Sequence, residues 1–193
     1  MKTAQYKAVI FDMDGTITLP VIDFQLIRSR IGLPPGDIAH EISKLSQTEK
    51  ERAWSIIEDY EKEAEEKQQL QPGVKALLNR CREESVLLGL ITRNIRRSVD
   101  ILCHKFNLEF DSIITREFPH IKPHPAPIIH MLEDWNTAPA DTLMVGDYIH
   151  DIDCGRAAGT ATCFFYNSGK ANFTAQADFT VKSMQELESR IFS

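Results

Sequence analysis

The first hydrophobic stretch of the chain is followed directly by charged residues. Residues 8–11 are four consecutive apolar residues, and two aspartates, Asp12 and Asp14, follow them one residue apart. A short, fully apolar run predicts a strand that is buried on both faces of a parallel sheet. Because side chains alternate along a strand, the two carboxylates can leave its carboxyl end on the same side. Ligands of open α/β sheets bind at that end of the strands.

The next segment, residues 18–71, has helical periodicity and no strand pattern. The predicted helices cover residues 21–31, 37–45 and 48–70. The longest of them starts at Thr48, because Glu51 lies three residues later and gives the spacing of a capping box. Its face rich in acidic residues is typical of a helix surface in contact with water.

From residue 73 onwards, helices and strands alternate. The predicted helices cover residues 74–84, 95–106, 125–135, 149–158 and 184–191, and the strands cover residues 85–91, 111–115, 142–146, 161–165 and 179–181. This alternation predicts a Rossmann-like three-layer α/β/α core with a mostly parallel sheet. We therefore expect two domains, a core of residues 1–17 and 72–193 and a small all-helical cap of residues 18–71. Because the cap is inserted after the first strand, we expect it to lie over the aspartates as a lid.

Composition and charge narrow the range of partners. The chain has 193 residues and a net charge of −6, which gives no reason to expect nucleic acid or an anionic membrane as a partner. Between Glu49 and Lys67 there are eight acidic and four basic residues, and this segment accounts for most of the net charge. We expect neither a signal peptide nor a membrane-spanning segment, because no apolar run has the required length. The four cysteines are scattered, as in proteins of the reducing cytoplasm.

Polar residues follow each of the first four strands of the core pattern. They are Asp12 and Asp14, then Thr92-Arg93-Asn94, then Lys122 in a Lys-Pro-His-Pro loop, and finally Gly146-Asp147 with Asp151. In a parallel sheet all of these points face one crevice. Together they provide carboxylates for a hard cation, a lysine, a hydroxyl group and backbone N–H groups, which is the set that phosphoryl transfer requires.

These residues resemble the motifs of the haloacid dehalogenase superfamily of aspartate-nucleophile phosphohydrolases. Asp12-Met-Asp14-Gly15-Thr16 matches the first motif, D-x-D-G-T, and the other three are matched by Thr92, by Lys122 and by Gly146-Asp147-x-x-x-Asp151. The resemblance covers residues 7–166 and indicates the branch of phosphoglycolate phosphatases and β-phosphoglucomutases. It implies an Mg²⁺-dependent phosphatase that acts on a small phosphorylated metabolite through an aspartyl-phosphate. The second aspartate favours phosphate esters over carbon–halogen bonds, because a departing halide needs no acid.

The resemblance also implies a role for individual residues. Asp12 would attack phosphorus, Asp14 would protonate the leaving alcohol and then accept a proton from water, and Lys122 would offset negative charge. The implied catalytic residues are Asp12, Asp14, Thr92 and Lys122. The implied substrate- and phosphate-binding residues are Gly15, Thr16, Arg93 and Asn94. The implied Mg²⁺ ligands are Asp12, the backbone carbonyl of Asp14, Asp147 and Asp151.

The substrate and two alternative functions stay open. Arg28, Arg30 and Lys44 of the cap are candidates for contacting a second charged group of the substrate, and His150 could reach the pocket. A phosphomutase of the same family is disfavoured, because residues 20–31 lack the cap histidine that such relatives carry. A phosphate-accepting receiver module would share the acids, the threonine and the lysine, but receivers lack both the helical insertion and the second aspartate. Continuous phosphate release would distinguish an enzyme from an acceptor.

Overall fold

The chain divides into two compact units. The computed structural model describes residues 4–21, 24–167 and 172–192. Unit 1 comprises Met1–Pro20 and Gln69–Ser193, and unit 2 comprises Val21–Gln68. The chain thus leaves unit 1 after the first strand and returns to it before the second. Each unit has its own cluster of buried hydrophobic side chains.

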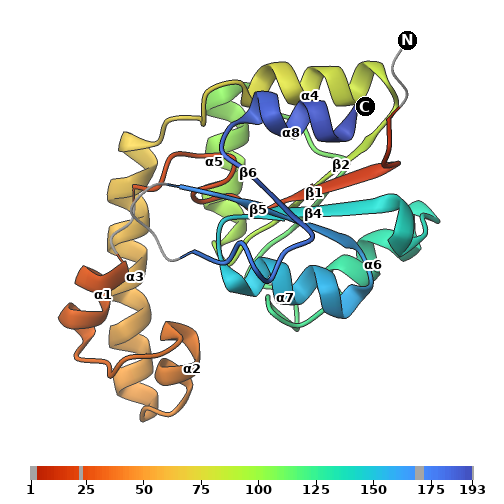
Figure 1. The fold of residues 1–193 in the computed structure, drawn as a ribbon. Helices are drawn as coiled ribbons and strands as arrows, with labels where there is room; N and C mark the ends of the chain where they lie inside the picture. Colours follow the sequence, from red (N-terminus) through yellow and green to blue (C-terminus); the bar gives the residue numbers. More distant parts are fainter. Residues whose placement is uncertain (1–3, 22–23, 168–171, 193) are drawn as a thin grey trace. The chain divides into compact units, whose positions relative to one another are not determined.

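Unit 1 is built on a sheet whose neighbouring strands are paired in parallel. Its described strands are β1 (Ala8–Phe11), β2 (Leu87–Ile91), β3 (Ser112–Ile114), β4 (Thr142–Gly146), β5 (Ala161–Phe165) and β6 (Phe179–Val181). Their order across the sheet is β3-β2-β1-β4-β5-β6, so β1 lies between β2 and β4 (Figure 1). The carboxyl ends of these three strands therefore lie side by side at one edge of the sheet.

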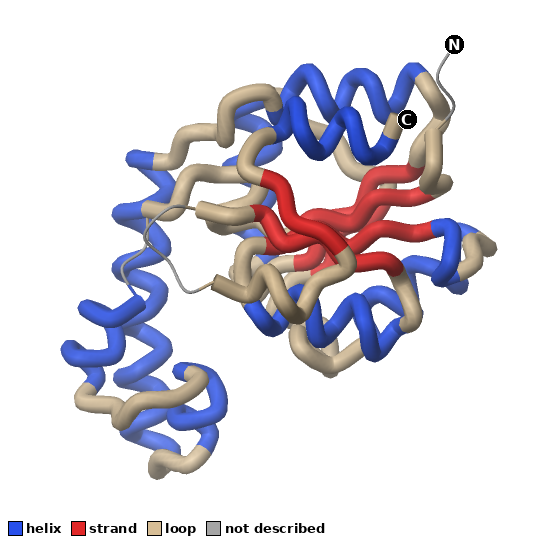
Figure 2. Tube along the Cα trace, in the orientation of Figure 1, coloured by secondary structure: helices blue, strands red, loops and turns tan. Residues whose placement is uncertain are grey.

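Helices cover both faces of this sheet, and the expected Rossmann-like α/β core is confirmed. The described helices are α4 (Val74–Glu83), α5 (Arg96–Phe106), α6 (Ala126–Trp135), α7 (Ile149–Ala158) and α8 (Met184–Ile191), with a 3-10 turn at Pro139–Asp141. Figures 1 and 2 show α4 and α8 on one face and α6 and α7 on the other. Within unit 1, the largest difference from the expected ends is at β2, which is expected from residue 85 and begins at Leu87. In unit 2, the long helix is expected to end at residue 70 and ends at Lys67.

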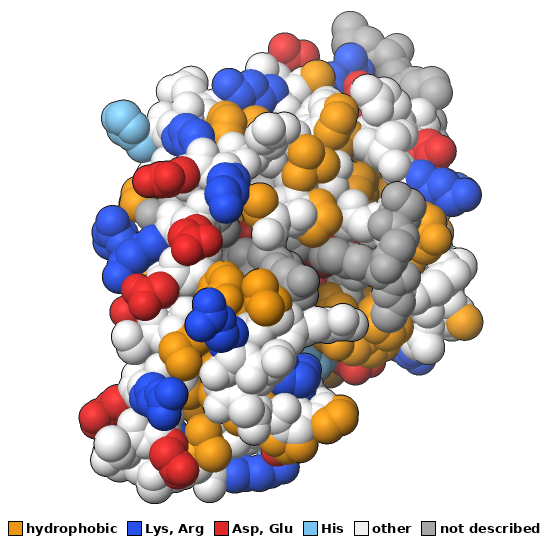
Figure 3. Space-filling view, turned by 90° about the vertical axis from the view of Figure 1, so that its left-hand side faces the viewer, with side chains coloured by type: hydrophobic (Ala, Val, Ile, Leu, Met, Phe, Trp, Pro, Cys, Tyr) orange, Lys and Arg blue, Asp and Glu red, His pale blue; other side chains and the backbone are white. Residues whose placement is uncertain are grey.

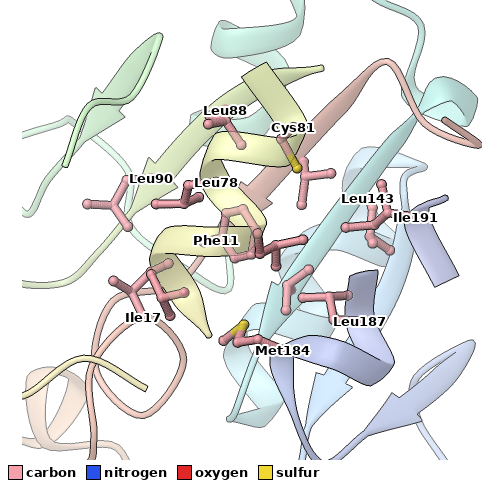
Figure 4. Close-up of a cluster of buried hydrophobic side chains, with 14 of the residues drawn as sticks. Phe11, Ile17, Leu78, Cys81, Leu88, Leu90, Leu143, Met184, Leu187 and Ile191 are labelled. Carbon is pink, nitrogen blue, oxygen red and sulfur yellow. The ribbon is translucent and has the colours of Figure 1, made fainter. Parts of the chain in front are cut away.

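β1 is buried on both faces, as its fully apolar sequence predicts. Phe11 belongs to the cluster that contains Leu78 of α4 and Leu187 of α8 (Figure 4), whereas Ile10 belongs to the cluster on the opposite face with Met131 of α6. All five side chains are almost completely withdrawn from water, and each such burial contributes about 1.5–3 kcal/mol. Packing from both sides fixes β1, and with it the start of the loop that carries the two aspartates.

Unit 2 consists of two short helices and one long helix around a small core. Its described helices are α1 (Phe24–Ile31), α2 (Ile38–Ser43) and α3 (Gln47–Lys67). Side chains from all three helices and the loop after α1 form the core: Ile27, Leu33, Ile42, Ala53 and Ile57. The expected first helix included residues 22 and 23, which lie outside the described residues. Asp37 caps α2 as predicted, accepting a hydrogen bond from the His40 N–H at 2.8 Å.

The predicted start of the long helix at Thr48 is wrong. The helix begins at Gln47, and its N-cap is Ser46, whose backbone N–H donates to the carboxylate of Glu49 at 3.0 Å. Ser46 and Glu49 have the same spacing as Thr48 and Glu51, so both pairs satisfy the capping-box pattern. In the structure it is Ser46 that has the extended backbone of an N-cap, with φ −64° and ψ 162°. Thr48 then falls inside the first turn.

The charged surface of α3 carries both signs. Most charged side chains between Glu49 and Lys67 are exposed, whereas Glu61 is buried. Figure 3 shows basic and acidic side chains interspersed on the face that it presents, rather than gathered into one patch of a single sign. Among the helices that the structure describes, none combines the length and the apolar character that a bilayer crossing needs.

Candidate active site

Four buried charged residues meet at the carboxyl ends of the central strands. Asp12 follows β1, Asp147 follows β4, Asp151 lies in the first turn of α7, and Lys122 comes from the loop between β3 and α6. The Lys122 Nζ atom lies 2.5 Å from Oδ1 of Asp12 and 2.7 Å from Oδ1 of Asp151. It also donates a hydrogen bond to the backbone carbonyl of Ile91 at 2.8 Å. The contact between Lys122 and Asp12 joins residues that are 110 positions apart in the chain.

The three carboxylates of this cluster fit a divalent cation. One oxygen from each of Asp12, Asp147 and Asp151 lies within 4.8 Å of the other two. Mg²⁺ holds its ligands at about 2.0–2.1 Å, which puts opposite ligand oxygens roughly 4 Å apart. When ionised, the three carboxylates carry three negative charges and Lys122 carries one positive charge, so two negative charges are left uncompensated. Buried charges are costly unless they are compensated, and a divalent cation supplies the two charges.

For both Asp12 and Lys122, burial shifts the pKa in one direction and the neighbouring opposite charge shifts it in the other. Burial raises the pKa of the Asp12 carboxyl, and Lys122 offsets only part of this effect, so the pKa of Asp12 stays well above its ordinary value. Burial by itself would lower the pKa of the Lys122 ammonium, but Asp12 and Asp151 outweigh it, and the pKa is raised. Lys122 is therefore charged at neutral pH, whereas ionisation of Asp12 depends on the positive charge placed next to it.

Gly146 makes room for the carboxylate of Asp151. A Cβ atom at residue 146 would lie 2.2 Å from the Cβ atom of Asp151, far inside any normal contact distance. The other carboxylate oxygen of Asp151, Oδ2, accepts a hydrogen bond from the Tyr148 N–H at 3.0 Å. The same side chain thus holds the start of α7 and reaches the charged cluster. This double use explains why the fourth motif needs glycine at its first position.

Asp14 has hydrogen-bond partners of its own, separate from the three clustered carboxylates. Its Oδ2 atom accepts a hydrogen bond from Nδ2 of Asn94 at 2.5 Å, and its Oδ1 atom accepts one from the hydroxyl of Thr18 at 3.3 Å. The backbone N–H of Asn94, a residue expected to bind phosphate, donates to Oγ1 of Thr92 at 3.1 Å. Asp14 is also partly exposed, whereas Asp12 is buried. Two carboxylates from one strand end therefore lie in different environments.

Two amide side chains that were not predicted as site residues hold the turn after β1. Gly15 has a φ of +87°, a conformation that favours glycine, and its carbonyl accepts hydrogen bonds from Gln71 at 3.2 Å and Asn167 at 2.6 Å. Asn167 also donates to Oδ2 of Asp147 at 3.2 Å. Its position two residues after β5, at the same sheet edge, is the signal that could have identified it. Thr16 is fully buried, and its Oγ1 atom has no hydrogen-bond partner among the described residues.

Arg93, expected to bind substrate, contacts a histidine of helix α7. Its Nη1 atom lies 2.8 Å from Nδ1 of His150, which is in the first turn of α7. Arg93 stands in the chain between Thr92 and Asn94. The structure thus brings His150 to the same sheet edge as the second-motif residues.

Two of the three cap residues considered for substrate contact form bonds within unit 2. The guanidinium of Arg28 donates to the carbonyl of Pro34 at 2.7 Å and to the carbonyl of Gly36. Lys44 forms an ion pair with Glu41, with 2.8 Å between Nζ and Oε1. Arg28 therefore stabilises the loop between α1 and α2, and Lys44 stabilises the end of α2.

Comparison with known proteins agrees with this architecture. A solved structure, described as a predicted phosphoglycolate phosphatase from Haemophilus somnus, is similar to this chain with a TM-score of 0.76 and 21% sequence identity, and the match covers 96% of this chain and 97% of that one. This likeness establishes the fold. A phosphoglycolate phosphatase of Chromobacterium violaceum is 28% identical over 97% of each chain.

Sequence similarity establishes the family. A haloacid dehalogenase-like hydrolase domain-containing protein of Arabidopsis thaliana is 36% identical, over 95% of this chain and 82% of that protein. The family model described as haloacid dehalogenase-like hydrolase matches residues 18–165, a segment that begins after the D-x-D-G-T motif. The chain therefore belongs to the family of haloacid dehalogenase-like hydrolases.

Proposed function

We propose that this hydrolase is a phosphatase that cleaves small phosphate monoesters, with Asp12 as the nucleophile and Asp14 as the general acid and base. The contrast between these two aspartates carries the proposal. Asp12 contacts the ammonium of Lys122 inside a buried cluster, whereas Asp14 is partly exposed and contacts two neutral donors. The ammonium of Lys122 favours ionised Asp12 as the nucleophile, and the partial exposure of Asp14 leaves its carboxyl group able to exchange a proton with a leaving group and with water.

The first step transfers the phosphoryl group to the enzyme. An Oδ atom of Asp12 forms a bond to phosphorus, and the bond between phosphorus and the ester oxygen breaks. Asp14, protonated at the start, gives its proton to the departing oxygen, so a neutral alcohol leaves. In the second step water attacks phosphorus, Asp14 takes a proton from that water, and the bond between phosphorus and Asp12 breaks. Inorganic phosphate leaves, and both aspartates return to their initial states.

We assign Mg²⁺ to the carboxylates of Asp12, Asp147 and Asp151, because hard cations prefer oxygen ligands. When bound, the ion would supply positive charge beside the phosphate oxygens. Lys122 holds Asp12 and Asp151 together through its two carboxylate contacts. These contacts orient the nucleophile before the substrate arrives, which lowers the entropic cost of the reaction.

Unit 2 is proposed to act as the cap that selects the ester. Its insertion between β1 and β2 supports this role. Where the chain leaves and re-enters unit 1, the Leu19 N–H donates to the carbonyl of Gln69 at 2.8 Å and the Gln71 N–H donates to the carbonyl of Ile17 at 2.9 Å. The two connecting segments are therefore paired with each other. The name of the Chromobacterium relative supports a small phosphorylated metabolite as the substrate. The four free thiols of the chain fit a cytoplasmic location.

Phosphate release from a panel of small phosphate monoesters tests the proposed function. We expect repeated turnover with Mg²⁺ and loss of activity when EDTA removes the metal. A single burst of about one phosphate per protein without turnover would instead indicate a phosphate-accepting module. Transfer of phosphate between two positions of a sugar, without net release, would indicate a mutase. Either result would contradict the proposal.

Replacing Asn167 by alanine is expected to weaken metal binding rather than abolish catalysis. Asn167 donates to the Asp147 carboxylate and to the Gly15 carbonyl, and loss of such orienting contacts typically costs about 10–100-fold in metal affinity. Titration of activity with Mg²⁺ should therefore show a higher half-saturating concentration, with activity recovered at high Mg²⁺. Asn172→Ala is the control, since Asn172 is exposed and accepts hydrogen bonds from Thr174. An unchanged Mg²⁺ titration for Asn167→Ala would contradict the assignment.

A further inference from the structure

Gln71 lies where the chain has just returned from unit 2 to unit 1. Unit 2 ends at Gln68, and unit 1 resumes at Gln69. The backbone N–H of Gln71 donates to the carbonyl of Ile17 at 2.9 Å, and the carbonyl of Gln71 accepts a hydrogen bond from the Val74 N–H at 3.2 Å. The backbone of Gln71 is therefore held on one side by the segment that leaves unit 1 and on the other by the start of α4.

The side chain of Gln71 is buried and makes two hydrogen bonds within unit 1. It is 7% exposed, and its Nε2 atom donates to the carbonyl of Gly15 at 3.2 Å and to Oδ1 of Asn167 at 3.0 Å. A buried amide is costly unless its hydrogen bonds are made. Because both N–H groups on Nε2 have an acceptor, these two contacts fix the position of the Gln71 amide.

The contacts of Asn167 allow its amide one orientation. Its Nδ2 atom donates to the carbonyl of Gly15 at 2.6 Å and to the carboxylate of Asp147 at 3.2 Å. A carbonyl and an ionised carboxylate can only accept hydrogen bonds, so Nδ2 has to face them. Rotation of the amide by half a turn would place Oδ1 against these two oxygens and Nδ2 against the N–H group of Gln71. The donor on Gln71 thus favours the one orientation in which Asn167 supports Asp147.

These contacts connect the metal-site carboxylates to the segments between the two units. Asp147 is 4% exposed and is one of the three clustered carboxylates. Its carboxylate bonds to Asn167, Asn167 bonds to Gln71, and the backbone of Gln71 bonds to Ile17 in the other connecting segment. Separation of the two connecting segments would therefore disturb the amide that orients Asp147.

We propose that Gln71 is a positioning residue for the metal site, and that it acts on Asp147 through the amide of Asn167. This inference rests on the Mg²⁺ assignment made in the proposed function. Its consequence is that metal binding and the pairing of the connecting segments stabilise each other, because Gln71 takes part in both. Thermodynamic linkage requires the two effects to be of equal size.

Binding of Mn²⁺ tests this role without a measurement of activity. Mn²⁺ prefers the same oxygen ligands as Mg²⁺, and the electron paramagnetic resonance signal of the free ion shows how much of it is bound. Gln71→Met keeps the length of the side chain and removes the amide. We expect it to weaken Mn²⁺ binding about 2–10-fold, because a neutral hydrogen bond to Asn167 is lost. Gln69→Met is the matched control, since Gln69 is exposed in the same segment, and it should bind Mn²⁺ like the wild-type protein.

A double variant distinguishes a positioning role from a general effect on the fold. If Gln71 acts through Asn167, the variant Gln71→Met/Asn167→Ala should bind Mn²⁺ as tightly as Asn167→Ala alone, whereas independent effects would multiply. Multiplied losses, or a Gln71→Met variant with the Mn²⁺ affinity of the wild-type protein, would overturn the inference and leave the metal assignment intact. Melting curves recorded without metal show whether each variant is folded.

Hydrogen exchange in the wild-type protein is a second measurement and needs no variant. The N–H groups of Leu19 and Gln71 each donate to a carbonyl of the opposite connecting segment. Saturating Mg²⁺ should slow the exchange of both amides by about the same 2–10-fold, as followed by NMR. The N–H group of Gln5, which bonds to the carbonyl of Ile191 before β1, is the control and should exchange at an unchanged rate.

The outcomes separate this inference from the function on which it rests. Exchange at Leu19 and Gln71 that is the same with and without Mg²⁺ would disprove the coupling. Wild-type protein that binds neither Mn²⁺ nor Mg²⁺ would contradict the metal assignment and this inference with it. Mn²⁺ binding with the expected response to Gln71→Met, but no phosphate release from any ester, would support the inference and contradict the phosphatase function alone.

Discussion

Replacing Asp12 by asparagine is expected to abolish phosphate release while the chain stays folded. The amide of asparagine has the shape of the carboxyl group but is a poor nucleophile. Loss of a nucleophile typically lowers kcat by at least about 10⁴-fold. The measurement is Mg²⁺-dependent phosphate release from the ester that the wild-type protein cleaves best. Asp153→Asn is the matched control, because Asp153 is an exposed aspartate in the same α7 that carries Asp151, and its activity should equal that of the wild-type protein.

The same substitution is expected to raise stability at neutral pH in the absence of metal. Burial holds the pKa of Asp12 above its ordinary value, so the folded state binds a proton more tightly there than the unfolded state does. The contribution of this group to stability is therefore full below about pH 3.9 and is lost as the pH rises through the raised pKa. Asparagine is neutral at every pH and avoids this loss. A gain of 1 kcal/mol would raise Tm by about 2–4 °C for a chain of this size.

Melting curves in EDTA, recorded from acid to neutral pH, check this effect. The difference in Tm between Asp12→Asn and the wild-type protein should grow as the pH rises. Addition of Mg²⁺ should then stabilise the wild-type protein more than the variant, which has lost one ligand carboxylate. An Asp12→Asn variant that retains most of the metal-dependent turnover would disprove the nucleophile assignment. If Asp12→Asn has a lower Tm than the wild-type protein at neutral pH in EDTA, the inference that burial destabilises the ionised Asp12 carboxylate is contradicted.

Replacing Lys122 by methionine is expected to damage both activity and stability. Methionine has a similar length but no charge, so Asp12 and Asp151 would lose the ammonium that lies 2.5 Å and 2.7 Å from their oxygens. Removing one partner from a buried ion pair typically costs about 3–5 kcal/mol, and Lys122 is 2% exposed. Loss of preorganised charge at a reacting centre typically lowers kcat by about 10²–10³-fold. Denaturant unfolding and phosphate release measure the two effects.

The pH dependence and a double variant make this prediction specific. The pKa of Lys122 is raised, so the contribution of its ammonium to stability is full below about pH 10.4, the ordinary lysine value, and is lost only above it. The cost of Lys122→Met should therefore be present throughout the neutral range. Lys75→Met, at an exposed lysine of α4, is the control. In the double variant Asp12→Asn/Lys122→Met, the free energy of unfolding should be higher than the sum of the two single changes predicts, because no unpaired Asp12 carboxylate is left buried. Strict additivity would show that the pair does not interact.

Local sequence was sufficient for the core elements and for the motif residues at the strand ends. β1 could be predicted because both of its faces are buried, which requires four consecutive apolar residues. The helices of unit 1 could be predicted because one face of each packs on the sheet, which imposes helical spacing. The start of α3 could not be predicted, because Ser46 with Glu49 and Thr48 with Glu51 have the same spacing. In the structure, the extended backbone of Ser46 and its contact with Glu49 identify the first pair as the cap.

Which side chains meet at the sheet edge depends on the order of the strands. Alternation of helices and strands predicts a parallel sheet, but the placement of β1 between β2 and β4 results from packing across the whole unit. That placement brings Lys122 to Asp12 and Arg93 to His150, residues 110 and 57 positions apart. The contact of Asn167 with Asp147 has the same origin. Residues that are distant in the chain meet through the fold, and no local pattern of hydrophobic and polar positions encodes such a contact.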